Sequence, residues 1–121
     1  MRKIESQMLT AIHNNQNWQS ANTSVTYTEE NNTSTVYLHG NKIAEIDDTT
    51  VAVFDGGWES NTTKSRLNVI INEFCNALTD GIFQKDYCWY VRDNNEVKMW
   101  QGSYLFAWLN VKKKVSHIQT I

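Results

Sequence analysis

Residue types suited to binding an anion gather around a pair of glycines, Gly56 and Gly57. Residues 61–66 read Asn-Thr-Thr-Lys-Ser-Arg and precede the strongest helical pattern in the chain. Glycines let a backbone approach a ligand closely, and the N–H groups of a helix start attract negative charge. Hydroxyl and cationic side chains nearby would strengthen such a site. The sequence therefore predicts an anion- or partner-binding site formed by Gly56, Gly57, Trp58, Thr62, Thr63, Lys64 and Arg66.

The same segment also has a purely structural interpretation, which is the more common one for helix starts. Asn61, Thr62 or Thr63 can cap the helix, since each has a side-chain oxygen that accepts from a first-turn N–H group. In this interpretation Arg66 pairs with Asp55 or with a backbone carbonyl. The segment lacks the GxxxxGK[ST] spacing, so it is not a P-loop. The two interpretations differ in what Arg66 contacts.

Catalytic and metal chemistry has weaker support in the residue pattern. His39 and Asp55 each end an expected strand and would form an acid–base pair if they met. The three histidines lack a ligand spacing among themselves, and Cys75 and Cys88 lack the CxxC spacing of a metal or redox site. We therefore expect reduced thiols, no metal, no cofactor and no enzymatic activity. An enzyme built on His39 and Asp55 is the weakest of the hypotheses.

Aromatic residues crowd the C-terminal third. In the expected hairpin of residues 87–100, alternation puts Trp89 and Tyr90 on opposite faces, so one face should present rings to solvent or to a partner. We predict an aromatic interaction surface that includes Trp89, Tyr90 and Trp100. Such rings can stack nucleobases, or they can anchor a partner protein or a dimer. The net charge of −2 favours the protein partner over nucleic acid.

The composition is that of a folded domain. With 121 residues, 40% apolar and 20% charged, the chain fits one domain spanning residues 1–121. It has no apolar run long enough to span a membrane and no signal-peptide pattern after Met1. We therefore expect a cytoplasmic protein without a membrane anchor.

The main helix should organise the core. Leu67, Ile70, Ile71, Phe74 and Leu78 recur at a helical period, and Gly81 suits the helix end. A shorter helix is expected over residues 2–14.

The remaining pattern is one of strands and turns. Residues Gly40-Asn41 and 93–95 are expected to be turns, residues 104–109 fit either a strand or a helix, and a loosely ordered tail is expected from about residue 111. The resulting order is α-β-β-β-β-α-β-β, which predicts an α+β fold: an antiparallel sheet of hairpins with both helices packed on it. The expected strands cover residues 22–28, 35–39, 42–47, 51–54, 87–92 and 97–100.

Part of the sequence resembles a known group of proteins. The segments VYLHGNKIA (36–44), Gly57-Trp58 and NTTKSRLN (61–68) resemble a pattern in small accessory proteins of tailed bacteriophages. The resemblance implies a phage protein made in the bacterial cytoplasm, and it carries no catalytic residues. The leading hypothesis is binding to a host protein, as an inhibitor of a defence or regulatory system. The alternative is a nucleic-acid or nucleotide-binding module that uses the 56–66 helix start and the 87–100 hairpin. Homo-oligomerisation stays open.

Overall fold

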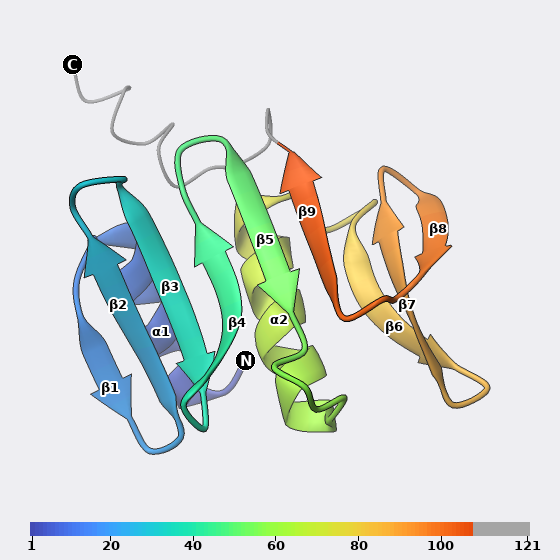
Figure 1. Cartoon of the computed structure of the whole chain (residues 1–121), viewed down its shortest axis with the longest axis horizontal. Helices are drawn as coiled ribbons and strands as arrows, with labels where there is room; N and C mark the ends of the chain where they lie inside the picture. Colours follow the sequence, from blue (N-terminus) through green and yellow to red (C-terminus); the bar gives the residue numbers. More distant parts are fainter. Residues whose placement is uncertain (108–121) are drawn as a thin grey trace.

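The computed structural model describes residues 1–107, which form two antiparallel sheets and two helices (Figure 1). This arrangement confirms the predicted α+β class. The predicted tail and the last two residues of the 104–109 segment lie outside the described residues. The elements are α1 (Lys3–His13), β1 (Trp18–Ser20), β2 (Thr23–Thr28), β3 (Thr33–Leu38), β4 (Asn41–Ile46), β5 (Thr50–Phe54), α2 (Asn61–Phe74), β6 (Gly81–Lys85), β7 (Cys88–Asp93), β8 (Glu96–Met99) and β9 (Ser103–Ala107).

The larger sheet has the strand order β1-β2-β3-β4-β5-β9, with neighbouring strands antiparallel. Both helices lie on the same face of it, behind the strands as viewed in Figure 1. The predicted four-strand meander is its centre. Two edge strands extend the meander: β1, which the sequence pattern missed, and β9, which resolves the ambiguous 104–109 segment as a strand up to Ala107.

The core lies between α2 and the larger sheet. Leu67, Ile70, Ile71 and Phe74 have no exposed surface, as the helical period predicted. Their predicted partners on the sheet are buried as well: Val36, Leu38, Val51 and Val53. The prediction that the apolar stripe of the main helix packs on this sheet face is therefore confirmed.

The last residue of the predicted stripe, Leu78, is a correction. The helix ends at Phe74, and Leu78 is 84% exposed. The cause is Asp80, whose carboxylate accepts hydrogen bonds from the N–H groups of Asn76 and Asn94. These bonds fold residues 75–80 into a turn, so Gly81 begins β6 and does not terminate the helix.

The β3–β4 hairpin also differs in detail from the expected turn. Its two positive-φ residues are His39 (52°) and Gly40 (79°), so the turn is one residue earlier than the predicted Gly40-Asn41. The register shifts between Val36, which pairs with Ala44, and Tyr37, which pairs with Lys42. Ile43 is the extra residue of a β-bulge, and it is buried beside the hairpin end.

The smaller sheet, β6-β7-β8, packs against α2, and one amide side chain of that helix bonds directly to the backbone of β6. Asn68 Nδ2 donates to the carbonyl of Ile82 and Asn68 Oδ1 accepts from the N–H group of Ile82, both at 2.8 Å. The Asn68 amide thus supplies β6 with the pair of hydrogen bonds that a neighbouring strand would give. In the turn that was predicted over residues 93–95, Asn94 and Asn95 have positive φ, and a second positive-φ pair lies at residues 86–87 of this sheet.

Replacing Asn68 with alanine should therefore loosen the smaller sheet. We expect a loss of about 1–3 kcal/mol in the free energy of unfolding, because two hydrogen bonds disappear and the backbone groups of Ile82 lose their partners. Urea unfolding, together with hydrogen exchange at the Ile82 amide, measures the effect. Asn72→Ala, on the exposed side of the same helix, is the matched control. Unchanged protection of Ile82 would contradict the role of this amide.

Candidate binding pocket at the start of the main helix

The loop before α2 is held in shape by one carboxylate. Asp55 Oδ1 accepts from the N–H group of Gly57 at 2.7 Å, and Asp55 Oδ2 accepts from the indole N–H of Trp100 at 3.0 Å. Gly56 (φ 68°) and Gly57 (φ 85°) both have positive φ, which glycine adopts without strain. A Cβ on Gly56 would also lie 3.1 Å from that of Asn41, so this turn packs closely on the β3–β4 hairpin.

Ser60 is the N-cap of helix α2, which corrects the predicted capping residue. Ser60 Oγ accepts from the N–H group of Thr63 at 3.1 Å and lies 2.9 Å from Thr63 Oγ1. The three residues predicted as caps, Asn61, Thr62 and Thr63, are instead in the first helical turn. Because Ser60 is the cap, the Thr62 hydroxyl has no side-chain partner among residues 1–107. Thr62 lines one side of a pocket.

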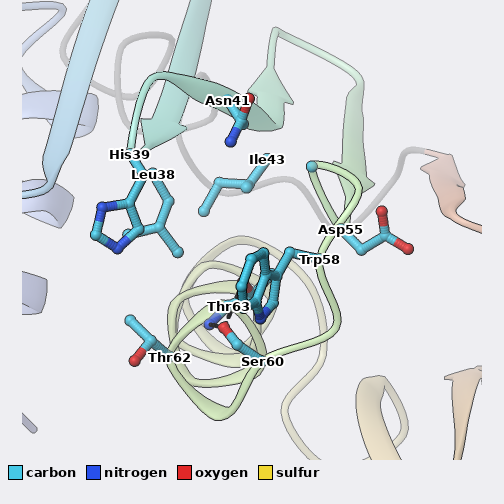
Figure 2. A pocket seen from close by; sticks show the side chains of 10 residues that line it. Leu38, His39, Asn41, Ile43, Asp55, Trp58, Ser60, Thr62 and Thr63 are labelled. Carbon is cyan, nitrogen blue, oxygen red and sulfur yellow. Dashed lines mark hydrogen bonds between the residues drawn. The ribbon is translucent and has the colours of Figure 1, made fainter.

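The pocket has a volume of about 490 Å³ and lies between the helix start and the β3–β4 hairpin (Figure 2). Buried Leu38 and Ile43 contribute its apolar surface, while Trp58 is 73% exposed. In Figure 2 the Trp58 indole lies over the start of the helix, beside Ser60 and Thr63. The lining residues are Leu38, His39, Asn41, Ile43, Asp55, Gly56, Trp58, Ser60, Thr62 and Thr63.

The structure brings only part of the predicted anion- or partner-binding site to this pocket. Gly56, Trp58, Thr62 and Thr63 line it, and Gly57 forms the adjoining turn. Lys64 does not line it, since Lys64 Nζ donates to Gln84 Oε1 at 3.3 Å on the side of the smaller sheet. The pocket therefore combines apolar side chains with hydroxyl, imidazole and amide groups.

Arg66 lies elsewhere, in the interior. Arg66 Nη1 contacts Glu5 Oε2 of α1 at 2.8 Å, and Arg66 Nε donates to Thr23 Oγ1 of β2 at 3.2 Å. Both ions are buried, and Ser65 Oγ also donates to Glu5 Oε2 at 2.6 Å. The predicted structural interpretation of Arg66 thus has the right role but the wrong partner, because Glu5, not Asp55, neutralises it. This guanidinium is not available to a ligand.

The electrostatics of the buried pair favour the ionised carboxylate. Burial raises the pKa of Glu5, but hydrogen bonds from Ser65 and Arg66 and the nearby guanidinium charge outweigh it, so the pKa lies below its ordinary value. The pair joins both helices to the sheet and is a structural element of the core.

His39 and Asp55 do not form an acid–base pair. They lie on opposite sides of the pocket in Figure 2, and the Asp55 carboxylate points away from it, toward its partners at Gly57 and Trp100. Within residues 1–107, no three His, Cys, Asp or Glu side chains gather as metal ligands. Neither helix of this part has the length and hydropathy needed to cross a bilayer.

The predicted aromatic surface is corrected for its two tryptophans. Trp89 is 4% exposed and Trp100 is 8% exposed, with ring centroids 6.0 Å apart, so both belong to the core. The cause is the docking of the smaller sheet, which turns Trp89 inward with its neighbour Val91. Tyr90 is on the opposite, half-buried face and stacks with Phe83. The sequence pattern missed Phe83, because it began the smaller sheet at β7 and overlooked β6.

Comparison with known proteins adds a family. The sequence matches the model of the Kyanoviridae Gp96 protein family over residues 1–107. No curated protein and no solved structure matches the chain. The match covers most of the 121 residues and confirms the phage origin that the sequence resemblance indicated. The chain therefore belongs to the Kyanoviridae Gp96 protein family, a bacteriophage family.

Proposed function

We propose that this phage protein acts by binding a host protein in the cytoplasm of the infected bacterium. The observation that carries the proposal is Trp58, a 73% exposed tryptophan beside a pocket of about 490 Å³. A large, rigid indole next to a concave apolar surface is typical of protein–protein hot spots. Tryptophan is enriched at such positions because it buries a large area at little cost in conformational entropy.

The pocket chemistry supports an apolar side chain of the partner as the occupant. Leu38 and Ile43 would contact its carbon atoms, and Trp58 would cover it from the solvent side. The groups of His39, Asn41 and Thr62 would hydrogen-bond to polar atoms of the partner around it. An apolar centre surrounded by polar groups is the usual anatomy of a protein interface.

The biological role that we propose is inhibition of a host defence or regulatory component. A small phage accessory protein that docks through one exposed indole would act by occupying a surface that its target needs. Nucleic-acid or nucleotide binding is the alternative function. Two groups that this alternative would use are not accessible: Trp89, a predicted stacking platform, is buried, and the guanidinium of Arg66 is paired in the core.

Trp58→Ala tests the proposal. We expect retention of the host partner to weaken about thirtyfold or more, because hot-spot truncation removes most of the local binding energy. Stability should change by less than about 0.5 kcal/mol, since the side chain is mostly exposed. The measurement is capture from host lysate on immobilised protein, with quantitative mass spectrometry of the retained proteins and thermal unfolding of each variant.

Leu78→Ala is the matched control, because Leu78 is an equally exposed apolar side chain beyond the other end of α2. The partner should be retained by the wild type and by the Leu78 variant and lost by the Trp58 variant. The proposal would be wrong if no retained protein follows this pattern. Salt-dependent binding of a nucleotide or an oligonucleotide, lost on Trp58→Ala, would favour the alternative.

A further inference from the structure

The smaller sheet has one buried face and one face turned to solvent. Ile82, Trp89 and Val91 belong to the buried face. The alternating residues form the opposite face, which we call the outer face, and none of them lines the pocket. It consists of Gly81, Phe83, Lys85, Cys88, Tyr90, Arg92, Val97 and Met99.

An apolar row runs across this face. Phe83 pairs with Tyr90 and Tyr90 pairs with Met99 in the strand register, so the three side chains are neighbours. The rings of Phe83 and Tyr90 stack with centroids 5.4 Å apart and planes 20° apart. Met99 is 65% exposed and Val97, beside the row, is 52% exposed. The outer face thus leaves a contiguous group of large apolar side chains in contact with water.

The charges on the outer face all have one sign. Its two charged residues, Lys85 and Arg92, are basic, whereas Asp93 and Glu96 alternate onto the other side of their strands. In the described part of the chain, neither Lys85 nor Arg92 makes an ion pair or a side-chain hydrogen bond. The apolar row therefore has an unneutralised cation on β6 and another on β7, in a protein whose net charge is −2.

We propose that the outer face docks a partner protein through an apolar segment flanked by carboxylates. The apolar atoms of that segment would cover Phe83, Tyr90 and Met99, and its carboxylates would pair with Lys85 and Arg92. Complementary charges at the border of such an interface set orientation and specificity. The outer face shares no residue with the lining of the Trp58 pocket, so the two proposals can be tested independently.

Two other occupants fit less well. A second copy that used the same face would place two exclusively basic surfaces against each other, which is unfavourable. Single-stranded nucleic acid needs ring faces that are open to a base. Phe83 and Tyr90 stack on each other, so one face of each ring is already covered. The like charge disfavours a second copy, and the partly covered rings offer limited stacking area to a base, so the acidic, apolar protein segment is the occupant that we propose.

A library of displayed random dodecapeptides tests the proposal. Peptides are selected on the wild type and on the Lys85→Glu/Arg92→Glu variant under reducing conditions, because Cys88 is exposed. We expect wild-type peptides to combine aliphatic or aromatic residues with flanking Asp or Glu. Their affinity should fall at least about tenfold on Tyr90→Ala and on the charge-reversed variant. The charge-reversed variant should itself select Lys or Arg at the flanks.

Two variants serve as controls. Arg2→Glu/Lys3→Glu makes the same change in net charge at exposed residues at the start of α1, outside the smaller sheet, and should leave the affinities unchanged. Trp58→Ala should also leave them unchanged, which separates this surface from the proposed pocket function. Thermal unfolding of each variant identifies losses of peptide affinity that come from misfolding. The charge-reversed variant tests the charges alone, because it keeps the apolar row intact.

The proposal is overturned if selected peptides show no acidic bias, or if they bind the charge-reversed variant as tightly as the wild type. It is also overturned if a twelve-nucleotide oligo(dT) binds and is lost with the same variants, which would assign the face to nucleic acid. A dimer seen in analytical ultracentrifugation and dissolved by Tyr90→Ala would assign it to a second copy.

Discussion

Phe74→Ala should lower the free energy of unfolding by about 3–5 kcal/mol, the range observed for truncating a buried phenylalanine. Phe74 is the last residue of α2, has no exposed surface and lies 4.9 Å from the His13 ring, centroid to centroid. Its removal would leave a cavity where α1, α2 and the sheet meet. Since domains of this size are stable by about 5–15 kcal/mol, the loss is a large fraction of the total. Urea unfolding followed by circular dichroism measures it.

Asn72→Ala is the control for this substitution, two residues earlier on the exposed side of the same helix. It should change stability by less than about 0.5 kcal/mol. Asn76, which the helical pattern placed beside Asn72, is not an equivalent control. Its backbone N–H donates to Asp80 and its side chain accepts from the N–H group of Leu78, so it shapes the turn after the helix. A Phe74 variant as stable as the Asn72 variant would refute the assignment of the core.

Arg66→Ala should have a comparable effect, about 3–5 kcal/mol, for an electrostatic reason. Truncation leaves the Glu5 carboxylate buried with Ser65 as its remaining side-chain partner, and an unpaired buried charge is strongly destabilising. The double variant Glu5→Leu/Arg66→Met removes both charges and should recover most of the loss. Equal destabilisation of the single and double variants would contradict this account, because the loss would then come from packing alone.

The contribution of the same ion pair to stability should change with pH in a direction that can be measured. The folded-state pKa of Glu5 is depressed, so its contribution to stability is present above the unfolded-state value and is lost as the pH falls through the folded-state value. In the Arg66→Ala variant the guanidinium no longer lowers this pKa, so the folded-state pKa of Glu5 should be higher than in the wild type. The stability difference between wild type and variant should therefore shrink on acidification below about pH 4.5. A constant difference across this range would exclude the Glu5 charge as its cause.

Local periodicity was enough to predict most of the elements. The meander from β2 to β5 followed from alternating residues, and the buried face of α2 followed from the spacing of Leu67, Ile70, Ile71 and Phe74. Periodicity failed where a distant or later residue decides the backbone. Leu78 continues the helical period, but the Asp80 carboxylate folds the chain away before it. β9 became identifiable as a strand only through its pairing with β5.

The candidate site could be predicted only where local residues define it, and not where it depends on distant contacts. The glycine turn, Trp58 and the threonines could be recognised because neighbouring residues define them. The place of Arg66 depends on Glu5, 61 positions away in the sequence, and no local signal indicates that contact. The burial of Trp89 and Trp100 depends on where the smaller sheet docks, and the side-chain hydrogen bonds of Asn68 to Ile82 and of Asp55 to Trp100 that contribute to this docking leave no local signal in the sequence. Alternation alone shows that a strand has two faces but not which of them is covered.

The ion pair between Glu5 and Arg66 also constrains folding during synthesis. Glu5 is synthesised 61 positions before Arg66, and at about 5–20 residues per second the delay between them is roughly 3–12 s. During this interval α1 carries an acidic side chain on the surface that must become interior. Docking of α1 before residue 66 is present would bury the Glu5 carboxylate without its cation, which is unfavourable. We therefore expect stable assembly only after Arg66 has been made, and a translation pause before Arg66 should prolong the exposure of the apolar sheet face to chaperones and proteases.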